Sequence, residues 1–95
     1  MTVRVALNIG ETAIDETFSG PTAEDVVAAM RASLARHAPP AVGLVMRFLT
    51  PVQFARQAVA RYAEATGRAL PPPASCAEFL DMACAEGFAA VIDDP

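Results

Sequence analysis

The sequence contains no lysine and no tryptophan, one histidine and two cysteines in 95 residues. Catalysis by a serine or cysteine nucleophile would therefore depend on His37 as its base, and no motif places an activating group beside it. A CxxC pair, a Cys/His metal spacing, a glycine-rich phosphate loop and a dinucleotide fingerprint are all absent. We expect no catalytic residues, no metal site and no cofactor, and we assign His37 to a helix end.

The two cysteines, Cys76 and Cys84, are eight residues apart in one expected helix. At about 1.5 Å per residue their Cα atoms lie about 12 Å apart, whereas a disulfide needs Cα atoms within roughly 7 Å. We therefore expect two free thiols on the buried stripe of that helix, in a reducing compartment.

Long apolar runs are also missing. The longest, Ala41 to Leu49, is interrupted by Gly43 and Arg47 and is far shorter than the ~20 residues that cross a bilayer. No apolar core of a signal peptide follows Met1. These absences predict a cytoplasmic protein with no membrane contact. All seven basic residues are arginine, and with the alanine and proline content this usage indicates a GC-rich, bacterial genome.

Apolar residues make up 54% of the chain and charged residues 19%, which favours one folded domain over residues 1–95. The mean hydropathy of +0.34 is high for a monomer. Either an apolar surface is covered by a partner, such as a second copy, or abundant alanine raises the average.

An alternating pattern over residues 2–9 and a weaker one over residues 11–18 predict a β-hairpin. Gly10 supplies the positive φ of a tight turn. If Ile9 and Gly10 form the loop, Arg4 lies opposite Asp15 as an ion pair on the wet face. The same register places Val5 opposite Ile14 on the core face.

Three helices are marked by Thr22, Thr50 and Ser75 as N-caps. The first ends near His37 because two prolines follow, and the others end at Gly67 and Gly87. Their expected buried stripes are, in chain order, Ala23, Val26, Val27, Met30 and Leu34; Val52, Ala55, Val59, Tyr62 and Ala63; and Cys76, Phe79, Leu80 and Ala83.

Residues 41–49 fit a short helix or a buried strand, and the adjacent Thr50-Pro51 helix start favours the helix. Residues 68–74 form a stiff proline-rich connector, and residues 88–92 a last strand. The fold class is therefore α+β. A hairpin and a C-terminal strand form a small three-stranded sheet, packed on one face against three or four helices in ββαααβ order.

Charge is unevenly distributed along the chain. Residues 1–29 carry a net charge of −4, residues 30–68 carry +5 and the remainder carries −5. The middle either presents a basic surface, with Arg31, Arg36, Arg56 and Arg61 as its members, or is neutralised by the acidic ends, which we favour. The acidic total and the core positions of the aromatic residues argue against a nucleic-acid partner.

Three residues are unusual for their segments. Glu16 shares a strand face with Ile14 and Phe18, Arg47 stands in an apolar segment, and Tyr62 lies on a core stripe. The leading hypothesis is a non-catalytic module that binds a protein partner or forms a homodimer through an apolar helical face or a sheet edge. The alternative is a protein, or minor enzyme, that binds an anionic small molecule at Glu16, Arg47 and Tyr62 between sheet and helices.

Overall fold

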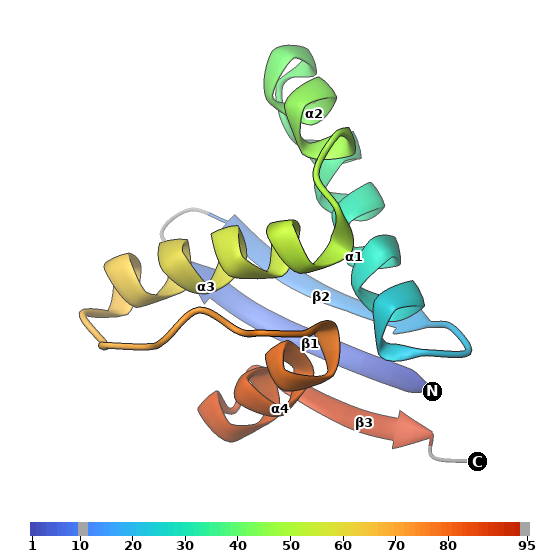
Figure 1. Cartoon of the computed structure of the whole chain (residues 1–95), viewed down its shortest axis with the longest axis vertical. Helices are drawn as coiled ribbons and strands as arrows, with labels where there is room; N and C mark the ends of the chain where they lie inside the picture. The colour runs from blue at the N-terminus through green and yellow to red at the C-terminus, as the bar shows by residue number, and fades with distance from the viewer. Residues whose placement is uncertain (10–11, 94–95) are drawn as a thin grey trace.

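The computed structural model describes residues 1–9 and 12–93. Its elements follow the α+β order expected from the sequence, with two strands, four helices and a last strand (Figure 1). They are β1 (Thr2–Ile9), β2 (Thr12–Ser19), α1 (Ala23–His37), α2 (Pro40–Arg47), α3 (Pro51–Thr66), α4 (Cys76–Glu86) and β3 (Ala89–Asp93).

The three strands form one antiparallel sheet in the order β2-β1-β3. Val3, Val5 and Phe18 are buried on one face, while Arg4 and Thr17 are exposed on the other. This is the alternation of a sheet with one packed face. The helices lie on the packed face (Figure 1), as predicted.

The hairpin register differs from the predicted one by two residues. Arg4 lies opposite Thr17, and Ile9 pairs with Thr12, so Ile9 belongs to the strand instead of the loop. Gly10, for which a positive φ is predicted, lies outside the described residues. A shift of two residues keeps Val3, Val5 and Phe18 on the predicted core face and Arg4 on the predicted exposed face.

The predicted ion pair survives that shift because Arg4 reaches Asp15 diagonally. Its Nε and Nη2 donate to the two carboxylate oxygens of Asp15, each over 3.2 Å. Both side chains are more than half exposed, so the pair contributes little to stability.

The helix ends lie where the sequence places them. Thr22, Thr50 and Ser75 each accept a hydrogen bond from the backbone N–H three residues on. Gly67 and Gly87 end α3 and α4 with φ values of 73° and 89°. These values lie in the left-handed region that favours glycine, so both stop signals are confirmed.

Residues 40–47 form a helix, which confirms the favoured alternative. Together with the second half of α1, this helix projects from the body of the molecule (Figure 1). Of the eight residues of α2, all described, Gly43 is the buried one. A Cβ atom at Gly43 would lie 2.6 Å from the carbonyl oxygen of Ala35, so α2 packs on α1 through backbone.

The core lies between the sheet and the helices. Its members are Val3, Val5, Phe18, Val26, Val27, Met30, Phe54, Ala55, Val59, Cys76, Phe79, Leu80, Ala83 and Ala89. Most of these core residues belong to the predicted strand faces and helix stripes, but Phe54 was not predicted to be buried. No helix among the described residues is long and apolar enough to cross a membrane.

The two cysteines are both free, but only one occupies the predicted position. Cys76 is buried, whereas Cys84 is exposed, so the prediction for Cys84 is wrong. Eight residues rotate a helix by about 80° beyond two full turns, which carries Cys84 past the edge of the buried stripe.

We expect Gly43→Ala to destabilise the protein by about 1–3 kcal/mol, because its methyl group would collide with the backbone of Ala35. Helix propensity alone predicts the opposite, a gain of about 1 kcal/mol. The control is Ala60→Gly at an exposed position of α3, which should cost about 1 kcal/mol. Urea unfolding measures both changes. A more stable Gly43→Ala protein would mean that the close approach imposes no constraint.

Thiol labelling should separate the two cysteines. Burial raises the pKa of the Cys76 thiol and the negative charge of Glu24 raises it further, while Cys84 is exposed. Because the thiolate is the reactive species, we expect one fast and one slow thiol in the native protein. Cys84→Ser should remove the fast phase and Cys76→Ser should leave it. Equal rates for the two thiols would contradict this assignment.

Candidate functional site

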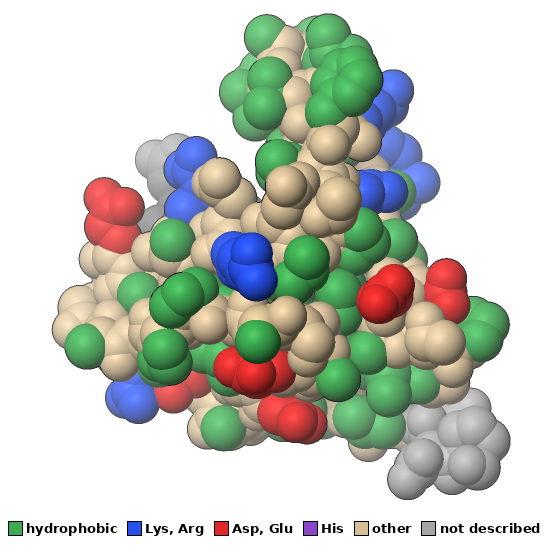
Figure 2. Space-filling model, viewed as in Figure 1, with side chains coloured by type: hydrophobic (Ala, Val, Ile, Leu, Met, Phe, Trp, Pro, Cys, Tyr) green, Lys and Arg blue, Asp and Glu red, His purple; other side chains and the backbone are tan. Residues whose placement is uncertain are grey.

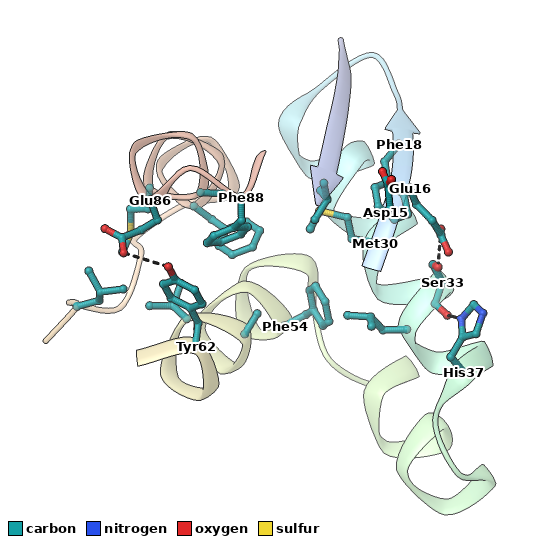
Figure 3. Close-up of a pocket in the computed structure, with 18 residues that line it drawn as sticks. Asp15, Glu16, Phe18, Met30, Ser33, His37, Phe54, Tyr62, Glu86 and Phe88 are labelled. Atoms are coloured by element: carbon teal, nitrogen blue, oxygen red, sulfur yellow. Dashed lines mark hydrogen bonds between the residues drawn. The ribbon is translucent and has the colours of Figure 1, made fainter. Parts of the chain in front are cut away.

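A cavity of about 280 Å³ lies between the packed face of the sheet and helices α1, α3 and α4. Apolar side chains form most of its wall: Val5, Phe18, Met30, Leu34, Phe54, Ala58, Val59, Leu70, Phe79, Met82, Ala83 and Phe88. Polar groups are gathered at two ends. Glu16, Ser33 and His37 lie at one end and Tyr62 and Glu86 at the other, with Phe54 and Met30 between them (Figure 3).

At the first end, β2 and α1 bring a carboxylate against a buried hydroxyl. Ser33 Oγ donates to Glu16 Oε2 over 2.8 Å, and Ser33 is 4% exposed. This bond satisfies the serine and leaves the second carboxylate oxygen of Glu16 without a bond to a described residue. Glu16 forms no ion pair with any described residue either, although neighbouring Asp15 is paired with Arg4.

His37 lies beside this pair without acting on the serine hydroxyl. Its Nδ1 is 2.8 Å from the backbone oxygen of Ser33. A carbonyl oxygen only accepts, so Nδ1 carries the hydrogen and donates it. A nucleophile and its base need the imidazole on the hydroxyl, but here the hydroxyl donates to Glu16. The geometry therefore holds Ser33 and Glu16 in place and is not that of a catalytic triad.

At the second end, Glu86 of α4 accepts a hydrogen bond from Tyr62 and forms an ion pair with Arg68. Tyr62 Oη donates to its Oε1 over 3.2 Å, and Arg68 Nε is 2.7 Å from the same oxygen. The ring of Tyr62 packs on that of Phe88 with centroids 4.8 Å apart, tilted by 49°. Burial raises the pKa of the Tyr62 phenol above 10.0, the charge of Glu86 raises it further, and Arg68 opposes the shift.

Two of the three proposed ligand-binding residues, Glu16 and Tyr62, line the cavity. Arg47 does not: it is exposed in the last turn of α2. The chain therefore does not bring the three together within one molecule. Among the described residues that line the cavity there is no arginine, so the anionic ligand of the alternative hypothesis meets no cation there.

The four arginines proposed as a basic surface are used in different ways. Arg31 donates to the backbone oxygen of Leu49, and Arg56 Nε donates to that of Pro73 over 3.0 Å. Arg36 and Arg61 are exposed. Within the described residues, the one acidic partner found for the basic middle is Glu86, which pairs with Arg68. Among the described residues, the acidic ends therefore neutralise only part of the charge of the basic middle.

Three residues that line the cavity were not predicted as site residues from the sequence: Ser33, His37 and Glu86. Helical spacing could have placed them. Ser33 and His37 follow Met30 at three and seven residues, and Glu86 follows Phe79 at seven. Within the part of the chain that is described, no three His, Cys, Asp or Glu side chains are grouped to hold a metal ion.

Comparison with protein-family models, with curated proteins and with solved structures gives no match. The interpretation of the cavity and of α2 therefore depends on their own residues.

Tyr62 is the single tyrosine and the chain has no tryptophan, so its ionisation can be followed by near-ultraviolet absorbance. We expect its midpoint above pH 10.0. Glu86→Gln should lower the midpoint, because the carboxylate charge is removed, and Arg68→Ala should raise it.

A raised pKa of Tyr62 favours the neutral phenol in the folded state. Its stabilising contribution is thus complete below pH 10 and is lost as the pH rises through the folded-state pKa. Shifts of the same sign in both variants would contradict the described contacts.

Proposed function

We propose that this protein is a self-associating module and that α2 is its docking surface. The observation that carries this proposal is the exposure of large apolar side chains on α2 and on its C-cap residue, Phe48. Val42, Leu44, Val45 and Phe48 are 50, 58, 63 and 81% exposed, respectively. Figure 2 shows hydrophobic side chains gathered on the part of the surface where Figure 1 places α2. Contiguous apolar patches on a protein surface mark sites of interaction.

The end strand of the sheet offers a second exposed apolar surface. Val91 and Ile92 of β3 are 46 and 57% exposed, at an edge where a further strand could pair. This surface contains two large side chains against four at α2. We therefore favour α2, with β3 as the alternative contact.

The amount of apolar surface limits what α2 contributes by itself. Fully burying a side chain of this size contributes about 1.5–3 kcal/mol, so covering four that are half or more exposed contributes on the order of 4–8 kcal/mol. A micromolar complex needs about 8 kcal/mol after the cost of association. A tight complex therefore requires α2 to enter a concave surface and gain further contacts.

Light scattering during gel filtration should give a mass that rises from 9.9 kDa toward twice that value with concentration. Phe48→Glu should weaken this association at least tenfold, because a carboxylate replaces the most exposed apolar side chain. Ile92→Glu on β3 is the matched control and should leave the association unchanged. If Ile92→Glu weakens the association more than Phe48→Glu does, the contact is at the sheet edge. If the wild-type protein is a monomer at every concentration, self-association is refuted.

Binding of a small molecule is the second candidate function, and the cavity is the observation that favours it. Its walls suit an apolar molecule, and its carboxylates suit a neutral or cationic one. The volume of about 280 Å³ is just below the roughly 300–1,000 Å³ of typical ligand pockets. This size fits a few side chains of a partner at least as well as a ligand, so we place this function second.

A further inference from the structure

The cavity and α2 are complementary in chemistry. The cavity has apolar walls and, at one end, the Glu16 carboxylate that forms no ion pair with the described residues. α2 has exposed apolar side chains, and Arg47 stands next to Phe48, the most exposed of them. The cavity therefore offers apolar walls with one anion, and the end of α2 offers apolar side chains with one cation. Specific interfaces show this kind of charge complementarity.

We propose that, in the self-associated protein, the end of α2 from one copy occupies the cavity of a second copy. Phe48 would enter between the apolar walls and Arg47 would pair with Glu16. This inference rests on the proposed function and identifies the surface that receives α2. It also brings Glu16, Arg47 and Tyr62 into one site, which a single copy does not do.

The volumes agree with this occupant. A cavity of about 150 Å³ suffices for a benzene ring in a protein interior. The cavity here, about 280 Å³, therefore holds the ring of Phe48 and leaves room for part of an aliphatic neighbour. Folded interiors contain few voids larger than a water molecule, so a cavity of this size is unusual and leaves its apolar walls without packing partners.

Glu16 is the carboxylate of the cavity best suited to an incoming cation. Asp15 already pairs with Arg4 and Glu86 with Arg68. Glu16 receives a hydrogen bond from Ser33, which fixes its orientation while its second oxygen remains available. A guanidinium is the cation that matches a carboxylate with paired donors.

Arg47 and Phe48 lie at the end of α2 that leads into α3 (Figure 1), and both are exposed, so a second copy can reach them. Each copy supplies one α2 and one cavity. A two-fold dimer in which each α2 enters the other copy uses both surfaces of both chains and closes the assembly. One-way docking would leave one free α2 and one free cavity at the ends and would give larger, open assemblies.

A double-mutant cycle tests the pairing of Arg47 with Glu16. Arg47→Gln and Glu16→Gln each remove a charge, and the glutamine at position 16 keeps an acceptor for Ser33. We expect each single variant to raise the dissociation constant five- to tenfold and the double variant to raise it no further. Arg61→Gln, an exposed arginine on α3, is the control and should have no effect. Independent, multiplying effects of the two variants would overturn the pairing.

Two further measurements test the occupancy of the cavity. Ala58→Phe fills the cavity from α3 and should weaken the association at least tenfold, with circular dichroism to verify folding. Benzylamine, a ring that carries a cation, should compete with α2 and shift the wild-type mass toward the monomer. Its binding is followed by the fluorescence of Tyr62.

The outcomes separate this inference from the proposed function. If Phe48→Glu disrupts the dimer while the charge cycle shows no coupling and benzylamine binds without changing the mass, α2 docks elsewhere and the cavity is a small-molecule site. If the wild-type protein is monomeric at every concentration, both proposals fail.

Discussion

The contact between Gly43 and the backbone of Ala35 decides which surfaces this molecule presents. Because the residue that faces α1 has no side chain, α2 approaches α1 at backbone distance and turns its large apolar side chains away. A larger residue at this position would lift α2 from α1 and change the direction in which Phe48 points. The projection, its exposed apolar tip and any docking through it therefore depend on one missing Cβ atom.

Two of the arginines fix connecting segments of the described structure. Arg31 and Arg56 each donate to a backbone oxygen of a connecting segment, Leu49 before α3 and Pro73 before α4. A guanidinium can do this with one donor and keep the others in water. The positive charge in the middle of the chain thus serves in part to fix the entries of α3 and α4, instead of forming one uniform surface.

Local sequence signals predicted most of the fold because they depend on neighbouring residues. Thr50 and Gly67 bound α3 through a side-chain hydrogen bond and a left-handed φ, which are properties of single positions. The hairpin register depends on where the turn lies, and Ile9 was assigned to the turn although it pairs in the ladder. Contacts between residues far apart in the sequence were harder to predict. Glu16 and Tyr62 both line the cavity. The sequence indicated no position for Arg47 relative to them, because the apolar pattern of a helix does not specify which surface that helix contacts.

The sheet has a consequence for the order of folding. Its central strand, β1, ends at Ile9, while its partner β3 begins at Ala89. At a synthesis rate of about 5–20 residues per second, β1 waits roughly 4–16 s before that partner exists. During this interval β1 pairs with β2 alone, and the edge that β3 later covers stays open. An open strand edge can pair with another chain, so the nascent protein is prone to aggregation until the residues of β3 have been made.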